Sequence, residues 1–556
     1  MRRLIILVVS VWLSACSVVD IKTQYPNPNA ELASRYFQVK IPTHDGLFIA
    51  ATVYQPALAV GESAPVIVST HGFGGFRMPR PMSIYGQLIL TGEASLAAWE
   101  NGYWVVSFDQ RGFGESDGDV MLMDPDYEVR DVSSVIDWVE RHLPRVSKDA
   151  SGDLAIGMVG ESYGGGAQIM ASIQDARIDA LVPIATWYDL AESIAPNDHV
   201  KTYWGAILMG AGGITSGFDF GKMLDDEYLA LINGKMNEAA KQDLVKRSPR
   251  YFCEKGQYPQ ADMLLLQGFR DTVFSINQAV KNRNCALKGG RDVRLMGIQD
   301  GHILPWPSQA WSGLPLFNTQ GEIVCGDQKF QTVDMIVQWW NEKQRGIPPL
   351  NPIPNVCLTF SDDDGMVVES VPVGGDILVF EETEVSLIQT GWFEMLLEPV
   401  DHLLGAASFS NKTPVLEDQA LEGGTFRPGF LPLKVIEEAG YVLGIPKAKL
   451  TLKTNVEAKD GVLFAAVGVR KNDSPYIHVL SEQYTPLPGD GYYEVDMPAI
   501  SRQLEKGDTI GIVLQGFSSQ YWFNPEGWFS SASVKGQLAL PIYPHRNTVQ
   551  VVAGVE

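Results

Sequence analysis

The sequence predicts an α/β domain with an inserted helical cap, followed by a second domain of the β-sandwich type. Three observations support this prediction. Short apolar runs alternate with amphipathic helical segments up to residue 345, a helix-rich segment at 187–250 interrupts the alternation, and helical patterns nearly vanish beyond residue 356. A chain of 556 residues is also too long for one ordinary domain.

Composition excludes several classes of protein. The chain is 45% hydrophobic and 20% charged, which is typical of a globular protein and not of a disordered chain or a polytopic membrane protein. It has 43 Lys and Arg against 66 Asp and Glu, a net charge of -23. An acidic surface repels phosphate backbones, so nucleic acid is not expected as a partner.

The N-terminus reads as a secretion signal. Arg2 and Arg3 precede the apolar run 4–13, which is too short to cross a bilayer. The following Leu13-Ser14-Ala15-Cys16 resembles the lipobox of bacterial lipoproteins. Residues 1–15 are then a cleaved signal peptide and Cys16 carries the lipid; the alternative is an ordinary signal, with Cys16 incidental. Ser17 after the cysteine implies an outer-membrane protein facing the periplasm of a Gram-negative bacterium.

The polar residues 16–34 then form a tether between the lipid and the first domain. In an oxidising compartment the other four cysteines favour disulfides, but four cysteines allow three connectivities and the sequence does not choose between them. The pairs Cys253/Cys285 and Cys325/Cys357 have equal separations of 32 residues. The chain has no Cys-x-x-Cys motif or Cys/His cluster, so no metal site is expected.

The α/β domain is predicted to cover residues 35–345. It opens with a hairpin, because strand-like residues 36–41 and 47–54 flank an Asp-Gly turn. Core strands are predicted at 66–69, 103–108, 154–159, 181–184, 263–266 and 293–296, and helices at 127–143 and 333–344. Continuous apolar strands between amphipathic helices indicate a parallel sheet covered on both faces.

Residues 187–250 lack a clear core strand and are predicted to form the helical cap, with a helix at 235–245. The stretch 346–356 carries four prolines and is interpreted as a linker. From 357 to 545 short strands of alternating polarity recur, as at 450–455 and 463–469, which predicts the β-sandwich.

Gly160–Gly164 matches the nucleophile elbow G-x-S-x-G, in which a strained turn between a strand and a helix exposes a serine hydroxyl. The pattern alone is weak, but its context strengthens it. The apolar run 154–159 leads into the motif and the small-residue helical stretch 165–172 follows it. Ser162 is therefore the predicted nucleophile, the alternative being a glycine-rich turn.

A serine hydroxyl needs a base, and the base needs an acid to orient it. After an elbow the order is serine, acid, histidine. Between Ser162 and the proline-rich stretch lie His199, in the expected cap, and His302, in a loop after a predicted strand. We therefore assign His302 as the base and Asp271, in the loop after the preceding strand, as the acid. Asp262, Asp292 and Asp300 fit less well by position.

The oxyanion hole is expected to use the backbone N–H of Tyr163 and a donor in the loop His71–Gly75, for which we choose Phe73. His71 is interpreted as a structural loop residue. Asp109 and Arg111, in the segment DQRGFGES (109–116), are interpreted as supports of the pocket.

These residues resemble the X-Pro dipeptidyl-peptidase-like hydrolases, which include the cocaine-esterase type. The resemblance covers about residues 36–543 and is carried by the following segments: His44–Gly46, Asp109–Ser116, Gly160–Gly165, Gly268–Asp271 and Gly301–His302. It implies an α/β-hydrolase domain, a helical cap inserted before the acid, and a jelly-roll-like C-terminal domain.

The chain departs from this family at two points. Cocaine-esterase-type members supply a tyrosine hydroxyl to the oxyanion from the loop where this chain has Phe73, so their substrate preference does not transfer. No acidic pair for the free amine of a peptide is evident either; Asp189, Glu192 and Asp198 in the cap are the candidates.

The predicted function is hydrolysis of an acyl ester or amide through an acyl-enzyme, on a small-molecule or peptide substrate and without a cofactor or metal. The alternatives are an X-Pro dipeptidyl-peptidase and a non-catalytic binding lipoprotein. Several tryptophans either line an apolar acyl pocket or pack in the core, and core packing is preferred: Trp187, Trp204, Trp392, Trp522 and Trp528. Asp362–Gly365 is interpreted as a solvated turn.

Overall fold

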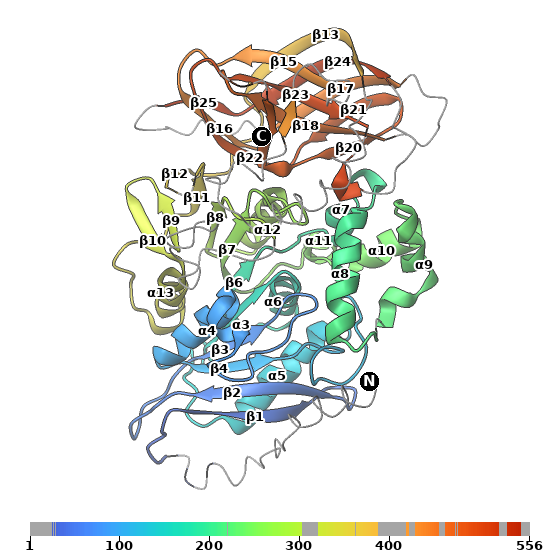
Figure 1. Ribbon diagram of the computed structural model, residues 1–556. Helices are drawn as coiled ribbons and strands as arrows, with labels where there is room; N and C mark the ends of the chain where they lie inside the picture. Colours follow the sequence, from blue (N-terminus) through green and yellow to red (C-terminus); the bar gives the residue numbers. More distant parts are fainter. Residues whose placement is uncertain are drawn as a thin grey trace, which may run out of the picture.

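The computed structural model describes residues 25–545 except 26, 28, 220, 303–320, 362, 387–418, 422–428, 455–461, 473, 475, 517 and 522–530. The expected signal peptide, Cys16 and most of the expected tether lie outside the described residues, as do Asp362, Trp392, Trp522 and Trp528. Figure 1 shows the α/β domain, the β-sandwich above it, and a group of helices along one side. Among the described helices, none is long and apolar enough to cross a membrane.

The α/β domain is built on a mixed sheet of ten strands in the order β1-β2-β4-β3-β5-β6-β7-β8-β11-β12. Pairing is parallel from β4 to β11 and antiparallel at both edges. The strands are β1 (Arg35–Pro42), β2 (Phe48–Gln55), β3 (Val66–Thr70), β4 (Trp104–Phe108), β5 (Ile156–Glu161), β6 (Ile178–Ile184), β7 (Asp262–Gly268), β8 (Val293–Ile298), β11 (Val356–Thr359) and β12 (Gly365–Val367). All eight predicted strands of this domain are present, and the Asp45-Gly46 turn joins β1 to β2.

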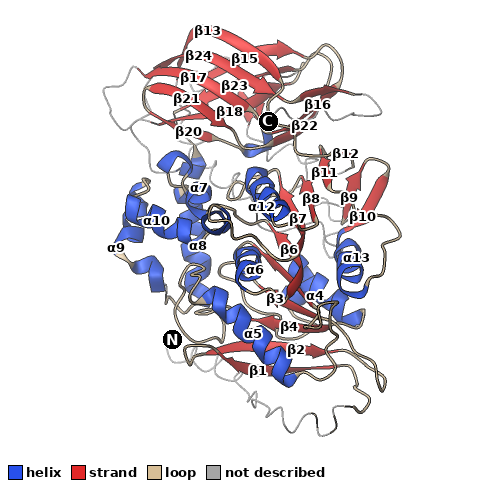
Figure 2. Ribbon diagram, turned by 180° about the vertical axis from the view of Figure 1, so that it is seen from behind, coloured by secondary structure: helices blue, strands red, loops and turns tan. Residues whose placement is uncertain are grey.

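Helices cover both faces of the sheet (Figure 2), which explains why its strands are continuous apolar runs. One buried cluster lies beneath α5 (Glu128–His142), α6 (Tyr163–Gln174) and α12 (Ile276–Lys288). The other lies beneath α4 (Leu90–Glu100) and α13 (Thr332–Arg345), with the short α3 (Ile84–Leu88) beside them. A two-stranded hairpin of β9 (Glu322–Cys325) and β10 (Gln328–Gln331) precedes α13.

The cap is inserted between β6 and β7 and is helical, as predicted. It contains α7 (Leu190–Ile194), η1 (Pro196–Asp198), α8 (Thr202–Thr215), η2 (Gly221–Leu224), α9 (Asp226–Leu229), η3 (Ala230–Asn233), α10 (Glu238–Lys246) and α11 (Pro249–Cys253). Figure 1 shows α8 standing along the side of the α/β domain with α9 and α10 outside it. The cap therefore follows the strand next to the elbow strand and ends before the strand that leads to Asp271.

The C-terminal domain is an antiparallel β-sandwich, which confirms the predicted fold class. One sheet has the order β13-β24-β17-β21, and the other has β14-β19-β18-β23-β15 with β20 beside β18. A small sheet, β22-β16-β25, lies next to them. The bounds are β13 (Asp376–Ser386), β14 (Gln419–Leu421), β15 (Gly429–Val435), β16 (Gly440–Gly444), β17 (Lys447–Thr454), β18 (Val462–Arg470), β19 (Tyr476–Val479), η6 (Leu480–Glu482), β20 (Thr485–Pro488), β21 (Gly491–Asp496), β22 (Ile500–Leu504), β23 (Thr509–Gln515), η7 (Ser519–Tyr521), β24 (Ser531–Leu540) and β25 (Ile542–Pro544).

The predicted boundary between the two domains needs correction. The sequence placed a linker at 346–356 and the start of the β-sandwich at 357, but β11 pairs in parallel with β8 and β12 pairs with β11. The main sheet thus continues to residue 367. The physical reason is that Val356–Leu358 is fully buried and apolar like the other core strands, and the proline-rich stretch is the connection from α13 back to the sheet.

Both disulfides lie in the α/β part of the chain. Of the three connectivities that the sequence leaves open, the structure contains the sequential one, Cys253–Cys285 and Cys325–Cys357. The first ties the last cap helix, α11, to α12, and the second ties the β9–β10 hairpin to β11.

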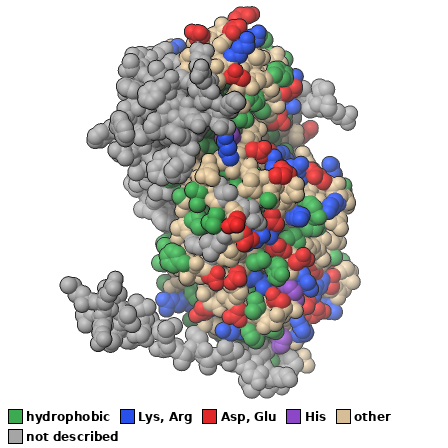
Figure 3. Space-filling model, turned by 90° about the vertical axis from the view of Figure 1, so that its right-hand side faces the viewer, with side chains coloured by type: hydrophobic (Ala, Val, Ile, Leu, Met, Phe, Trp, Pro, Cys, Tyr) green, Lys and Arg blue, Asp and Glu red, His purple; other side chains and the backbone are tan. Residues whose placement is uncertain are grey.

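The surface carries charges of both signs. Figure 3 shows acidic and basic side chains interspersed with hydrophobic ones on the described part of one face. In the cap, Ile214 and Ile232 are 76% and 66% exposed. The charge of -23 is therefore not gathered into one block on this face.

Candidate active site

Ser162 lies at the sharp turn between β5 and α6. Its backbone has φ 50° and ψ -111°, which is a strained conformation for a residue other than glycine. The two glycines of the motif make the turn possible. A Cβ at Gly160 would come within 2.7 Å of the Gly164 carbonyl, and one at Gly164 would come within 2.7 Å of the Thr70 carbonyl oxygen.

His302 lies next to Ser162, in the loop after β8. The distance from the Ser162 Oγ to the His302 Nε2 is 3.0 Å, and that from the His302 Nδ1 to the Asp271 Oδ2 is 2.9 Å. The imidazole is 7% exposed. The edges of Trp204 and Phe274 pack against it, with centroid distances of 5.3 and 5.1 Å. The three predicted triad residues are therefore brought into one hydrogen-bonded chain.

Asp271 is fully buried, and hydrogen bonds fix its carboxylate. Its Oδ1 accepts from the amides of Val273 (2.9 Å) and Phe274 (2.8 Å). Its Oδ2 accepts from the Gln267 Nε2 at 2.9 Å in addition to His302. A buried carboxyl group held by four hydrogen bonds can keep an imidazole in one orientation.

The loop that carries Asp271 is held by the β-sandwich. The Gln483 Nε2 donates to the carbonyls of Phe269 and Asp271, both at 2.9 Å. Arg270 donates through Nε to the Glu482 Oε1 at 3.0 Å, and both side chains are 6% exposed. Glu482 itself has a positive φ of 56°, so this contact is made from a strained backbone.

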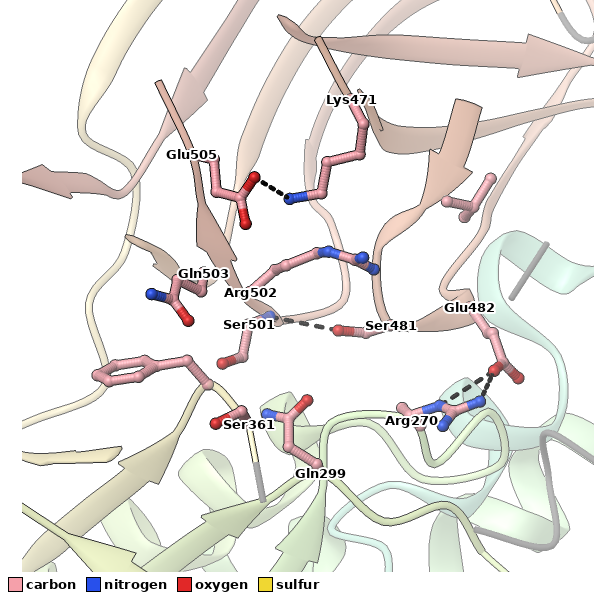
Figure 4. A pocket seen from close by; sticks show the side chains of 12 residues that line it. Arg270, Gln299, Ser361, Lys471, Ser481, Glu482, Ser501, Arg502, Gln503 and Glu505 are labelled. Atoms are coloured by element: carbon pink, nitrogen blue, oxygen red, sulfur yellow. Dashed lines mark hydrogen bonds and ion pairs between the residues drawn. The ribbon is translucent and has the colours of Figure 1, made fainter. Parts of the chain in front are cut away.

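A polar cavity of about 190 Å³ lies beside this contact, and Figure 4 shows the Arg270–Glu482 pair at its edge. None of the three triad residues lines it. Lys471 and Glu505 form a second ion pair across the cavity, with 3.8 Å between the Lys471 Nζ and the Glu505 carboxylate.

Removing Glu482, the buried partner of Arg270, should strongly weaken the contact between the β-sandwich and the loop that carries Asp271. We expect Glu482→Ala to lower the free energy of unfolding by about 3–5 kcal/mol, because it leaves the Arg270 guanidinium buried without its carboxylate. Glu505→Ala is the matched control: its carboxylate is 74% exposed, and we expect a change below about 1 kcal/mol. Urea unfolding measures both. Equal effects of the two substitutions would contradict this account of the Arg270–Glu482 ion pair.

The predicted oxyanion donors face the same site. Tyr163 is the first residue of α6, and the first amide that donates back to the elbow is that of Gly166, to the Ser162 carbonyl at 3.0 Å. The amides before it belong to the open N-terminus of the helix. Phe73 packs edge-on against Tyr163 at 5.4 Å. Their role as donors remains a prediction.

The Tyr163 hydroxyl is already engaged in hydrogen bonds. It donates to the Glu128 Oε1 at 3.0 Å and accepts from the Met123 amide at 2.6 Å. Burial raises the pKa of Glu128 to about 7. This phenol therefore fixes the wall of the site, and only the backbone amide of Tyr163 remains a candidate for oxyanion binding.

His71, Asp109 and Arg111 support the loops around the site. His71 is fully buried, donates to the Gly72 carbonyl at 2.8 Å and accepts from the Gln110 amide at 3.0 Å. Burial lowers its pKa, so the imidazole is neutral. Asp109 pairs with Arg77, and Arg111 pairs with Asp45 and Asp131. These contacts agree with structural roles.

A cavity of about 460 Å³ opens beside the triad, between the α/β domain and the cap. Its described lining is almost entirely apolar and includes Phe73, Leu122, Trp187, Leu190, Ile194, Trp204, Leu208, Met209, Tyr228, Leu231, Leu244 and Phe274. Core packing was the preferred reading for Trp187 and Trp204. Both are buried in the core cluster, which bears out that preference, and both also line this cavity.

The acidic residues of the cap do not reach this cavity. Asp189 pairs with Arg250, Glu192 with Lys281, and Asp198 with Lys241, each at 2.6 Å. None of the three is among the described residues that line the cavity. They are therefore committed to ion pairs within the fold and do not provide a site for an amine.

Glu161, directly before the nucleophile, was missed by the sequence analysis. Burial raises the pKa of its carboxyl to about 7, and no hydrogen bond to it is found among the described residues. Glu161 occupies the variable position of G-x-S-x-G, so the motif does not single it out. The sequence shows only an acidic residue at the end of a buried strand.

This carboxyl predicts a pH-dependent stability. Because the pKa of this carboxyl is raised in the folded state, its contribution to the free energy of unfolding is fully present below the unfolded pKa of about 4.5. This contribution is lost as the pH rises through the folded pKa of about 7. Glu161→Gln removes the effect. Between pH 5 and pH 8 we expect wild type to lose about 1–3 kcal/mol relative to the variant in urea unfolding. A difference that does not change with pH would contradict this.

Among the described residues, two groups of acidic residues, one of them with a histidine, have the spacing of metal ligands, and both groups have other partners. In the first group Asp45 and Asp131 pair with the Arg111 guanidinium, and the His44 Nδ1 lies 3.9 Å from the Asp131 carboxylate. In the second group Asp149 accepts amides of its own turn, and Asp179 accepts the Ile156 amide at 2.7 Å. Neither group lines the triad cavity among the described residues.

Residues 45–303 match the model of the X-Pro dipeptidyl-peptidase (S15) family. The matched range contains all three triad residues and the whole cap. A 31.7 kDa protein of Escherichia coli from the traX-finO intergenic region is 35% identical over 118 residues, 21% of this chain. The match spans 36% of that curated relative, about a third of its length.

Two solved structures are similar to this chain in fold over nearly its whole length. An α-amino acid ester hydrolase has a TM-score of 0.63 at 14% identity, over 96% of this chain and 99% of that one. A CocE/NonD family hydrolase from Staphylococcus aureus has a TM-score of 0.58 at 11% identity, over the same shares. The fold of an α/β domain followed by a β-sandwich is therefore shared with these proteins.

Proposed function

We propose that this protein is a serine hydrolase that cleaves an ester or amide bond through an acyl-enzyme intermediate. The observation that carries the proposal is the hydrogen-bonded chain from Ser162 through His302 to the buried Asp271. In this arrangement each residue has the neighbour that its role requires.

The first half of the reaction forms the acyl-enzyme. The His302 Nε2 takes the proton of Ser162 as Oγ attacks the substrate carbonyl, and Asp271 stabilises the imidazolium without being protonated. The amides of Phe73 and Tyr163 donate to the oxyanion. As the intermediate collapses, the His302 Nε2–H gives its proton to the leaving alcohol or amine.

The second half repeats these steps with water. The His302 Nε2 takes a proton from the water that attacks the acyl carbonyl, and then returns it to the Ser162 Oγ as the acid leaves. No group other than the triad and the two amides is needed to move a proton or to hold charge.

An apolar acyl ester fits the cavity better than an X-Pro dipeptide. A dipeptidyl-peptidase must bind a free ammonium group, and a buried ammonium needs a carboxylate partner. The described lining of the cavity contains no carboxylate, and the three candidate residues of the cap, Asp189, Glu192 and Asp198, are paired elsewhere. We therefore expect kcat/KM for 4-nitrophenyl butanoate to exceed that for Gly-Pro-4-nitroanilide, with Ser162→Ala as the blank. Preferred cleavage of the anilide would support the dipeptidyl-peptidase instead.

We also propose that Cys16 carries a lipid that holds the protein at the outer membrane. The lipobox-like residues 13–16 support this, and the two disulfides suit an oxidising compartment. Labelling with an alkyne analogue of palmitate should mark wild type but not Cys16→Ser, which should become soluble in the periplasm. Equal labelling of both would contradict the proposal.

A further inference from the structure

Lys201 is a buried cation in the wall of the triad cavity. It lies directly before α8 in the cap, and only 8% of the residue is exposed. Its Nζ donates to the Val273 carbonyl at 3.1 Å. Among the described residues that line the cavity, Lys201 and the triad base His302 are the only ones that can carry a charge near neutral pH.

The Lys201 ammonium group has more N–H donors than its hydrogen bond to the Val273 carbonyl occupies. It carries three N–H groups, and among the described residues no carboxylate lies within 4 Å of it. The two acids whose charges reach it are committed elsewhere: Asp271 to His302, and Glu192 to Lys281. Burial lowers the pKa of Lys201 to about 8, so it remains mostly a cation at pH 7.

A purely structural role does not account for this residue. Holding one carbonyl requires a single neutral donor, whereas burying an unpaired cation is costly. The nearby Trp204 makes such a neutral contact, from its Nε1 to the Thr272 Oγ1 at 2.9 Å. Lys201 is therefore a charged donor at a position where an uncharged donor would bind the Val273 carbonyl at a lower cost in free energy.

The position of Lys201 is close to the triad acid. The carbonyl that it holds belongs to Val273, whose amide donates to the Asp271 Oδ1 at 2.9 Å. Lys201 thus contacts the loop that carries the triad acid, and it lines the same cavity as Ser162.

We infer that the acyl part of the substrate carries a carboxylate, which the Lys201 ammonium binds at a short distance from the scissile carbonyl. The substrates are then half-esters of short dicarboxylic acids, whose methylene chain packs on the apolar wall. This inference rests on the proposed function, because it names the acyl group that Ser162 would take.

Three 4-nitrophenyl esters test it: the half-ester of glutaric acid, its neutral methyl ester of the same length, and the pentanoate. We expect wild type to prefer the half-ester over the methyl ester in kcat/KM. In Lys201→Met this ratio should fall at least about tenfold, the loss expected for one charge-assisted hydrogen bond. Lys201→Arg should retain the preference, and Lys241→Met, at a half-exposed lysine of the cap, should leave the ratio unchanged.

The wild-type pH profile is a second test that needs no variant. The ratio of half-ester to methyl ester should decline as the pH rises above about 8, because Lys201 loses its proton there. The charged groups that act on the Lys201 ammonium are Asp271 and Glu192, and neither is among the described residues that line the cavity. A ratio that does not depend on pH, or that is unchanged in Lys201→Met, would overturn the inference.

Fluorophosphonate labelling of the same samples separates the two proposals. Labelling at Ser162 without a preference for the half-ester would overturn only the role of Lys201. Absence of labelling in the wild type would overturn the proposed function and, with it, the inference. A preference for the methyl ester would show that the site binds a neutral acceptor, which also contradicts a carboxylate.

Discussion

Ser162→Ala should lower kcat for a 4-nitrophenyl ester by at least about 10⁴-fold, because no acyl-enzyme can form without the Oγ nucleophile. The residual rate comes from the oxyanion donors and from substrate binding. The variant should fold normally, since the contacts that hold the elbow are made by the backbone. They run from the Ser162 amide to the Ile184 carbonyl at 2.8 Å and from the Gly166 amide to the Ser162 carbonyl at 3.0 Å.

Steady-state kinetics with matched urea unfolding checks this result. Because the fold is retained, the midpoint of unfolding should move little while kcat falls. A variant that keeps more than about one hundredth of the wild-type kcat would contradict the assignment of the nucleophile.

Asp271→Asn should lower kcat on the order of 10⁴-fold while preserving the geometry of the site. The amides of Val273 and Phe274 require an acceptor, so the asparagine Oδ1 must face them. The NH₂ group then faces the His302 Nδ1, which must become the acceptor, and the hydrogen bond from the Gln267 Nε2 is lost. The proton of the imidazole moves to Nε2, where it blocks removal of the Ser162 proton.

The effect of Asp271→Asn should appear in kcat more than in KM, since the acid touches His302 and not the substrate. Asn282→Ala is a suitable control, because this residue is also buried behind the cap but contacts the Trp187 carbonyl. Its kcat should stay within about tenfold of wild type. Equal losses in both variants would indicate a general defect and would contradict a specific role of Asp271.

The sequence was sufficient for the parts of the fold that obey local rules. The core strands are apolar because both faces of the sheet are covered, and the elbow needs glycines at the positions where a Cβ would meet the backbone. The chain order of serine, acid and base follows from the order of the strands. This is why Ser162, Asp271 and His302 could be chosen before their distances were known.

The predicted domain boundary was wrong for a physical reason. Prolines in 346–355 are as compatible with a connection that returns to the sheet as with a linker. The burial of Val356–Leu358 depends on pairing with β8, about 60 residues earlier in the chain, and no local pattern reports it.

The contacts between distant segments could not be predicted from the sequence either. Gln483 holds the loop of Asp271 from a different domain, and Lys201 reaches the triad cavity from the cap. A single lysine or glutamine in a sequence reads as a surface residue, because these types are mostly exposed. Only the tertiary structure shows that these two are buried.

The most direct test of the account is the intact mass of the protein after reaction with a fluorophosphonate probe. We expect wild type to gain one probe adduct, mapped by peptide sequencing to Ser162 in the elbow Gly160–Gly164, and Ser162→Ala to gain none. An unmodified wild type, or an adduct that persists in Ser162→Ala, would contradict the claim that Ser162, His302 and Asp271 form a catalytic triad.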